Sequence, residues 1–271
     1  MPELPEVETT LKGISPYIDQ QKIKNINIYN PNMRWPVDPH LSNHLLNKSL
    51  LSIIRRGKYL ILTFDNGYLL LHLGMSGSLR VVDPSISPEK HDHFEIIFNN
   101  NKALRLRDPR RFGAVVWTEK PWQQHKLIKH LGPEPLSEEF TAAYLHKKSR
   151  KKTVCIKTFI MNSQVVVGVG NIYASESLYL AGIRPTINAG RISLKRYESL
   201  VAAIKQVLAE AIKQGGTTLR DFSSPEGKPG YFAQKLQVYG RAGEACYQCD
   251  NLIKQKTIAN RATYYCTNCQ H

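Results

Sequence analysis

The first residues, Met1-Pro2-Glu3-Leu4-Pro5-Glu6, are the stretch around which the chain is organised. Proline at the second position is small enough to permit removal of Met1, which would leave Pro2 with a free secondary amine. An unprotonated amine is a nucleophile, and its attack on a sugar carbonyl carbon gives an iminium ion, a strong electron sink. An ordinary α-amino group has a pKa of about 7.7–8.0. Because a secondary amine is more basic, its surroundings would have to lower that pKa.

A helix is predicted directly after this start. Pro5 suits the first helical turn, where its missing N–H is not needed, and the helix dipole favours Glu6 in that turn. Apolar residues then recur at helical spacing, as in a helix packed on a core: Val7, Leu11, Ile14 and Ile18. The simplest alternative is an ordinary capped helix whose glutamates are solvated.

The composition indicates a polyanionic partner. The chain of 271 residues is long enough for two domains, and 37 Lys and Arg against 22 Asp and Glu give a formal charge of +15. Nucleic acid is the simplest polyanion, although a merely basic protein has the same composition. The acidic N-terminus lacks the apolar stretch of a signal peptide, and apolar runs such as Tyr59–Leu62 are too short to span a membrane. We therefore expect a cytoplasmic protein.

Short strand-like runs separated by turn signals dominate the chain from residue 22 to residue 118. Asp65-Asn66-Gly67 is a hairpin signal, and residues 99–102 form a longer turn. Such runs predict a β-sandwich or barrel. They are Lys22–Tyr29, Lys58–Phe64, Tyr68–Leu73, Phe94–Phe98, Ala103–Arg107 and Arg111–Thr118. Residues 119–135 contain three prolines and are interpreted as a linker between domains.

The pattern becomes helical from about residue 136. One long amphipathic helix is expected from Tyr197 to Ile212, with a stop signal at Gly215-Gly216. Residues 217–231 are rich in Gly, Pro and Ser and predict a long loop. A loop of this length in a compact domain is usually functional or disordered.

Two glycines, Gly168 and Gly170, precede a further predicted helix that extends to Gly182. Backbone N–H groups at such a helix start bind phosphate, and Asn171 adds a side-chain donor. The basic run 147–152 and Lys157 lie upstream. The alternative is that the glycines only start a helix and that the charges are only solvated.

Four of the five cysteines form two pairs, Cys246-x-x-Cys249 and Cys266-x-x-Cys269, separated by sixteen residues. In a reducing compartment such pairs indicate a metal rather than disulfides. The spacing is typical of a structural zinc site, in which four thiolates fill a tetrahedron. Iron in a rubredoxin-like site is the alternative. Cys155 has no such pair and is expected to be a buried or half-buried thiol.

A small hairpin is predicted between the two cysteine pairs, from Lys254–Ile258 and Ala262–Tyr265. Asn260 and Arg261 lie near its tip. An arginine on a tip that is braced by a metal can enter a DNA groove. The simpler alternative is an ordinary exposed arginine.

Five motifs together resemble the formamidopyrimidine-DNA glycosylase family, from the first residue of the chain to the last. They are Pro2–Glu8, Asp108–Gly113, Gly168–Glu176, Gly227–Phe232 and the C-terminal cysteines, in the order of the family. The resemblance implies an α+β multidomain fold with DNA in the cleft between its halves. The implied parts are a catalytic helix with a β-sandwich flanked by helices (1–118), a linker (119–135), a helix–two-turns–helix domain (136–235) with its lesion-recognition loop (217–231), and a four-cysteine zinc finger (236–271).

The resemblance also implies a bifunctional DNA glycosylase and abasic-site lyase of base-excision repair. Such an enzyme excises oxidised purines, chiefly 8-oxoguanine and formamidopyrimidines, from double-stranded DNA and then cleaves the strand by β- and δ-elimination. Pro2 would attack C1′ of the damaged nucleotide, Glu3 would act as acid and base, and Glu6 would help to set the lesion pocket. Lys58, which matches a lysine that contacts phosphate near the lesion, and Arg261 complete the predicted catalytic group. Further DNA-backbone contacts are implied for His91, Lys157, Asn171 and Arg261.

The target atom is inaccessible inside a duplex, so the damaged nucleotide must be flipped out, which leaves a hole in the stack. Met75 offers a flexible apolar plug, Phe112 a flat wedge, and Arg110 donors for the orphaned base. Periodicity alone favours the alternative that Met75 and Phe112 are core residues.

Two other functions compete with this prediction. An endonuclease VIII-like enzyme would prefer oxidised pyrimidines, but that group usually has a different start and lacks the arginine–phenylalanine insertion motif. A non-catalytic zinc protein that binds damaged or bent DNA would need neither a free Pro2 amine nor Glu3. Retention of Met1 would block the amine and favour that binding protein. We expect a monomer with one structural zinc ion.

Overall fold

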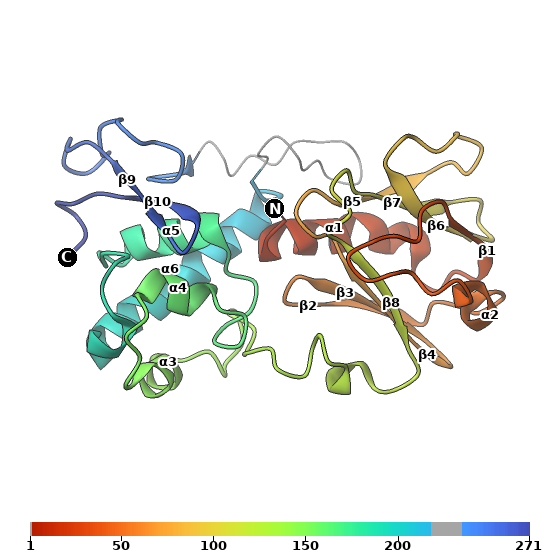
Figure 1. Ribbon diagram of the computed structural model, residues 1–271, viewed down its shortest axis with the longest axis horizontal. Coiled ribbons are helices and arrows are strands. Elements are labelled where there is room, and N and C mark those ends of the chain that lie inside the picture. Colours follow the sequence, from red (N-terminus) through yellow and green to blue (C-terminus); the bar gives the residue numbers. More distant parts are fainter. Residues whose placement is uncertain (1, 218–234) are drawn as a thin grey trace. The chain divides into compact units, whose positions relative to one another are not determined.

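The computed structural model describes residues 2–217 and 235–271. Apart from Thr217, the predicted loop 217–231 lies outside the described residues, and so does the motif Gly227–Phe232. The described chain divides into a first unit, residues 2–130 with 215–217, and a second unit, residues 131–214 with 235–271. Figure 1 labels the helices and strands of both.

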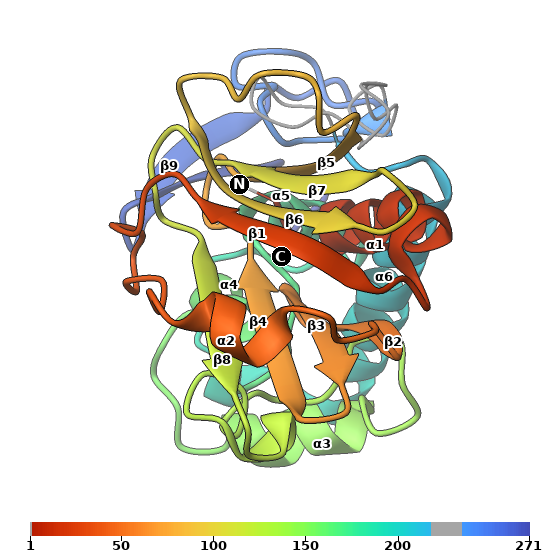
Figure 2. The same cartoon turned by 90° about the vertical axis from the view of Figure 1, so that its right-hand side faces the viewer.

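The first unit contains two antiparallel four-stranded sheets (Figure 2). One sheet has the order β1 (Ile23–Ile28), β6 (Asp92–Phe98), β7 (Ala103–Arg107) and β5 (Ser78–Val82). The other has the order β2 (Ser52–Arg56), β3 (Tyr59–Phe64), β4 (Gly67–His72) and β8 (Ala114–Thr118). The short helix α2 (Leu41–Leu45) and the 3-10 turn η1 (Trp122–Gln124) belong to the same unit.

One hydrophobic core joins both sheets to helix α1 (Leu4–Ile18). Val7, Ile14 and Ile18 of α1 are at most 1% exposed. These are three of the four apolar positions that the helical spacing identified, since a stripe at that spacing lies on one side of a helix. The predicted β-sandwich flanked by helices is thus confirmed.

Two strands of the sandwich, β2 and β5, were not predicted from the sequence. Each lies at the edge of its sheet, and neither has a continuous apolar face buried in the core. An edge strand of this kind lacks the strong alternation on which strand prediction depends. The predicted strand Arg111–Thr118 begins only at Ala114, because Arg111 has φ +58° in the turn that precedes β8.

The second unit is helical and ends in a hairpin. Its longest helix, α6 (Leu194–Lys213), is capped by Ser193, whose hydroxyl accepts the Arg196 N–H. Gly215, after the helix, has φ +74°. The other helices are α3 (Ala142–Ser149), α4 (Ile156–Met161), α5 (Asn171–Leu180) and the 3-10 turn η2 (Ala189–Arg191). The hairpin strands β9 (Lys254–Ile258) and β10 (Arg261–Tyr265) pair in antiparallel register, and β10 lies beside α5 (Figure 1).

None of the described helices of either unit is long and apolar enough to cross a bilayer.

Candidate functional sites

The N-terminal carboxylates are buried beside Pro2. Glu3 and Glu6 are each 2% exposed, and Pro2 is buried as well. Glu6 accepts two backbone N–H groups at 2.8 Å, that of Glu3 on one oxygen and that of Thr217 on the other. The alternative of a helix whose glutamates are solvated is therefore wrong. Burial of a carboxylate is costly unless hydrogen-bond donors surround it. The two bonds therefore hold the backbone of Glu3 and the backbone of Thr217 next to the Glu6 carboxylate.

The approach of residue 216 to this site depends on a glycine. Gly216 has φ +82°, and a Cβ atom added to it would lie 2.9 Å from a Glu6 carboxylate oxygen. A side chain at this position would be strained and would displace Glu6 from Thr217.

His72, at the end of β4, lies close to the predicted phosphate contact Lys58. Its Nδ1 accepts the Gly74 N–H at 2.9 Å, and its ring centroid is 4.7 Å from that of Tyr59. Burial, followed by the positive charges of Lys58 and Arg34, lowers the pKa of His72 to about 4. The ring is thus neutral at physiological pH with its proton on Nε2, where it can serve as a hydrogen-bond donor. His72 was not predicted from the sequence, because a lone histidine at a strand end carries no distinct signal.

The residues predicted to fill the vacated stack lie on two loops, one with Met75 and one with Arg110 and Phe112, and their side chains differ in exposure. Phe112 is 41% exposed, and the Arg110 guanidinium lies 4.8 Å from its ring centroid. Met75 is half-buried. The alternative that Phe112 belongs to the core is therefore wrong.

Asp108 ties these two loops together from a fully buried position. One carboxylate oxygen accepts the Ser76 hydroxyl at 2.9 Å and the Arg110 N–H at 3.2 Å, and the other accepts the Gly113 N–H at 2.8 Å. The Asp108 N–H donates to the carbonyl of His91, which is half-buried. One carboxylate thus fixes the backbone next to Met75 and next to Phe112.

Asp108→Asn is expected to loosen the loop that carries Phe112. The amide keeps one acceptor oxygen, so at least one of the three donors loses its partner, which costs about 1–3 kcal/mol of local stability. We expect the Gly113 amide to exchange roughly 5- to 150-fold faster in hydrogen-exchange measurements. Ser76→Ala is the control, because it leaves the acceptor of Gly113 in place. Equal exchange in Asp108→Asn and the native protein would show that this carboxylate does not hold the loop.

In the second unit, Asn171 at the start of α5 faces the hairpin. Its side-chain amide donates to the Ala262 carbonyl at 2.9 Å and to the Tyr239 hydroxyl at 3.4 Å. The side-chain oxygen Oδ1 of Asn171 is buried without a hydrogen-bond partner. The predicted phosphate donor is thus already engaged with protein acceptors, the weaker of which is Tyr239.

Glu176, further along α5, is a buried residue whose role was not predicted from the sequence. Its carboxylate accepts three consecutive backbone N–H groups, those of Gln237, Val238 and Tyr239, at 2.8–3.0 Å. Burial raises the pKa of Glu176, and the three donors act in the opposite direction. Glu176 therefore holds the backbone of Tyr239 against α5.

Lys157, which was predicted to contact the DNA backbone, is buried. It is 1% exposed, and its ammonium donates to the Ala262 carbonyl at 3.2 Å and to the Thr263 hydroxyl at 2.8 Å. Arg261, the first residue of β10, is exposed. Lys157 thus supports the hairpin strand that presents Arg261.

The four paired cysteines converge in the second unit. Their Sγ atoms all lie within 4.8 Å of one another, and those of Cys249 and Cys266 are 3.4 Å apart. The Tyr179 hydroxyl of α5 lies 3.1 Å from the Cys246 Sγ. Four thiols at these distances fit a tetrahedral metal ion. Cys155 is half-buried and lies apart from this cluster, with its Sγ 3.2 Å from the Thr158 hydroxyl.

Two family models match the chain. Residues 1–115 match the formamidopyrimidine-DNA glycosylase N-terminal domain, and residues 131–223 match the H2TH domain of the same glycosylases. The chain belongs to the formamidopyrimidine-DNA glycosylase family. The resemblance noted from the sequence motifs is thereby confirmed.

Individual members of the family are similar to the chain over its full length. Formamidopyrimidine-DNA glycosylase of Saccharophagus degradans is 53% identical over 270 residues, which cover 100% of each protein. The structure of wild-type Lactococcus lactis Fpg with DNA containing N7-benzyl-Fapy-dG has a TM-score of 0.92 at 36% identity, with 100% of both chains covered. The complex of Lactococcus lactis Fpg with DNA containing an abasic site has a TM-score of 0.90 at 35% identity, with 99% of both chains covered.

Proposed function

We propose that the protein is a base-excision-repair enzyme that excises oxidised purines, chiefly 8-oxoguanine and formamidopyrimidines, and then cleaves the DNA strand at the abasic site. The observation that carries this proposal is the burial of Glu3 and Glu6 beside Pro2 at the start of α1. The two carboxylates also cap the first turn of α1, so their burial supports an enzyme only together with the Met1-Pro2 start, which can expose a secondary amine beside them. Complexes of a Lactococcus lactis relative with DNA containing N7-benzyl-Fapy-dG and with DNA containing an abasic site support both steps.

The proposed chemistry begins at Pro2 after removal of Met1. The amine attacks C1′ of the flipped nucleotide, the bond from C1′ to the base breaks, and the base departs with a proton. Glu3 supplies and removes protons at the sugar as its ring opens. The resulting iminium ion withdraws electrons, so loss of a C2′ proton expels the 3′ phosphate, and a second elimination expels the 5′ phosphate. A one-nucleotide gap remains.

The remaining predicted residues act on the DNA around the flipped nucleotide. Met75, Phe112 and Arg110 fill the vacated stack, and Glu6 shapes the lesion pocket through its bond to Thr217. The DNA backbone is contacted by Lys58, His91, Asn171 and Arg261. We assign Lys157 a positioning role beneath the hairpin, since its ammonium bonds to Ala262 and Thr263. The domain boundaries 1–118, 119–135, 136–235 and 236–271, a monomeric state and a cytoplasmic location remain part of the proposal.

The metal of the cysteine cluster is proposed to be one zinc ion held by Cys246, Cys249, Cys266 and Cys269. All four ligand atoms are thiol sulfurs, which suit zinc in a closed structural site. When bound, zinc contributes binding energy to the folding of the finger.

A panel of damaged duplexes tests the proposed substrate. Excision of 8-oxoguanine and formamidopyrimidine should exceed excision of oxidised pyrimidines, because the chain has the arginine–phenylalanine motif at Arg110 and Phe112. A preference for oxidised pyrimidines would favour an endonuclease VIII-like enzyme. Tight binding without cleavage of any duplex would favour a binding protein.

Arg110 is expected to make the enzyme prefer cytosine opposite the lesion. Arginine offers only donors, and the orphaned cytosine presents O2 and N3 as adjacent acceptors, whereas adenine presents one acceptor beside a donor amino group. A bidentate contact gives about 1–3 kcal/mol of discrimination, or roughly five- to 150-fold. In Arg110→Ala the ratio of excision opposite cytosine to excision opposite adenine should approach one, while abasic-site cleavage falls less. An unchanged ratio would make Arg111 the next residue to test.

A further inference from the structure

The hydroxyl of Tyr179, near the end of α5, points at the cysteine cluster. Tyr179 is 3% exposed, and its hydroxyl oxygen lies 3.1 Å from the Sγ atom of Cys246, which is fully buried. A buried hydroxyl requires a hydrogen-bond partner, and the Cys246 sulfur is the partner that this one has. The Tyr179 ring belongs to the hydrophobic cluster beneath the cysteines, so packing fixes the direction of the hydroxyl.

The direction of this hydrogen bond changes when the cluster holds a metal ion. Without a metal, either the thiol or the hydroxyl can donate. A metal ion binds the thiolate, because the ligand must lose its proton. The Cys246 sulfur then has no proton to give, whereas a phenol keeps its proton at neutral pH. In the loaded site Tyr179 is therefore the donor, and a bond to an ionised acceptor is stronger than a neutral one.

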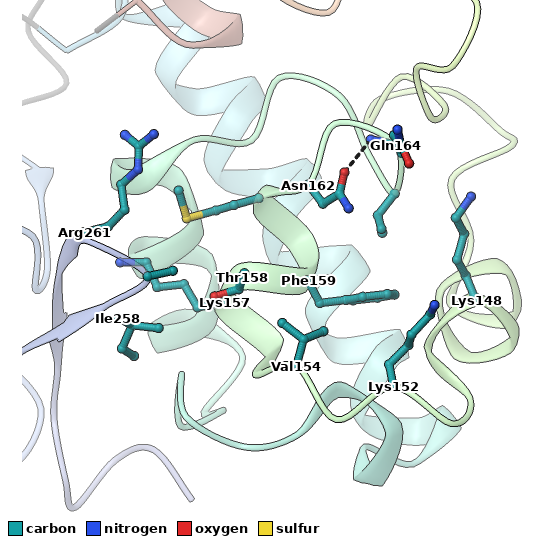
Figure 3. A pocket seen from close by; sticks show the side chains of 13 residues that line it. Lys148, Lys152, Val154, Lys157, Thr158, Phe159, Asn162, Gln164, Ile258 and Arg261 are labelled. Carbon is teal, nitrogen blue, oxygen red and sulfur yellow. Dashed lines mark hydrogen bonds between the residues drawn. The ribbon is translucent and has the colours of Figure 1, made fainter.

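The helices hold the segment that contains the cysteines through several other side chains. Asn171, at the start of α5, donates to the backbone of β10, and Glu176 accepts three backbone N–H groups before the first cysteine pair. Lys157 of α4 extends toward the hairpin that carries Arg261 (Figure 3). Asn171, Glu176 and Lys157 thus fix the chain around the cluster, whereas Tyr179 bonds to a metal ligand itself.

We propose that Tyr179 is a positioning residue of the zinc site and retains zinc by donating a hydrogen bond to the Cys246 thiolate. Four thiolates around one divalent ion leave a net negative charge, which is costly in a buried site unless donors stabilise it. The hydroxyl supplies such a donor and orients the sulfur toward the ion. The inference rests on the zinc ion of the proposed function and extends its site beyond the four ligands.

Tyr179→Phe tests the donor, because it removes the hydroxyl and keeps the ring. Tyr247→Phe is the matched control: Tyr247 follows Cys246 in the sequence, but it is 67% exposed and its ring lies against the Arg241 guanidinium. Transfer of zinc from the full, zinc-loaded chains to a colorimetric chelator is measured. Loss of a partner of a metal ligand typically weakens metal affinity by about 10- to 100-fold, which we expect in Tyr179→Phe and not in Tyr247→Phe.

Cobalt in place of zinc supplies a measurement that packing alone would not change. The sulfur-to-cobalt charge-transfer band reports the electron density on the thiolates. Loss of the hydrogen bond raises the energy of the electrons on the Cys246 sulfur, so less energy moves one of them to the metal. The band should therefore shift to longer wavelength in Tyr179→Phe and stay in place in Tyr247→Phe.

Two results would overturn the proposal. Unchanged zinc transfer in Tyr179→Phe would show that the hydroxyl does not retain the metal, and faster transfer with an unchanged cobalt band would attribute the effect to packing. Elemental analysis of the native chain separates this proposal from the zinc assignment. If the native chain holds zinc, either result defeats the role of Tyr179 alone, whereas a native chain without metal defeats the zinc assignment itself.

Discussion

Borohydride reduction of the protein on abasic DNA is expected to yield a covalent adduct on the N-terminal peptide, at Pro2. Reduction converts the iminium ion to a stable amine, so the attachment site identifies the nucleophile. The expectation follows from the Met1-Pro2 start and from the buried carboxylates Glu3 and Glu6 next to it. Mass spectrometry of the digested adduct locates the bond. An adduct on a lysine, such as Lys58, would refute the assignment.

Two variants separate the roles of the amine and of the carboxylate. Pro2→Gln is expected to retain Met1, which moves the terminal amine away from Glu3 and should lower excision on the order of 10³-fold or more. Glu3→Gln keeps the Pro2 amine, so trapping on abasic DNA should persist, while 8-oxoguanine excision falls by about 10²–10⁴-fold. If Pro2→Gln trapped as well as the native protein, the nucleophile would lie elsewhere.

Replacement of Cys249 by serine is expected to abolish tight DNA binding and to leave most of the helical structure intact. The four Sγ atoms lie within 4.8 Å of one another, and loss of one thiolate leaves an incomplete tetrahedron. The binding energy of the metal is folding energy for the finger. The hairpin that presents Arg261 lies between the two cysteine pairs, so it should lose its fixed position. We expect affinity to fall on the order of 10²-fold or more, about 3 kcal/mol.

Cys155→Ser is the matched control, because Cys155 is the one cysteine outside the cluster. It should retain one zinc ion per chain and full DNA affinity. Elemental analysis, circular dichroism and binding to a duplex with a tetrahydrofuran abasic-site analogue measure the three expected effects. Full affinity in Cys249→Ser without bound metal would show that the cluster is not a structural metal site. Iron in the native protein would instead favour the rubredoxin-like alternative.

Local patterns were sufficient to predict the features whose chemistry lies within a short stretch of sequence. The spacing of Cys246, Cys249, Cys266 and Cys269 predicted their convergence, since each pair spans one tight turn. The helical spacing after Pro5 predicted α1, and the turn at Asp65-Asn66-Gly67 predicted the β3–β4 hairpin. The edge strands β2 and β5 escaped prediction because their burial is partial and irregular.

Burial and long-range hydrogen bonds could not be predicted, because they depend on which distant segments pack together. The Lys157 ammonium donates to Thr263, which is 106 residues away in the sequence. Because the partner is so distant, the local sequence could not predict that Lys157 is buried and supports the hairpin. The bond from Thr217 to Glu6 spans 211 residues. The pKa of His72 is low because the fold buries the ring and places the positive charges of Lys58 and Arg34 near it. The sequence by itself determined the family, and it indicated the zinc ligands and the N-terminal nucleophile that we propose, because their signals are local in the chain. Only the tertiary structure decided which charged groups are buried and which remain exposed to a ligand. It also decided which backbone segments the buried charged groups hold by hydrogen bonds, because those segments are distant in the sequence.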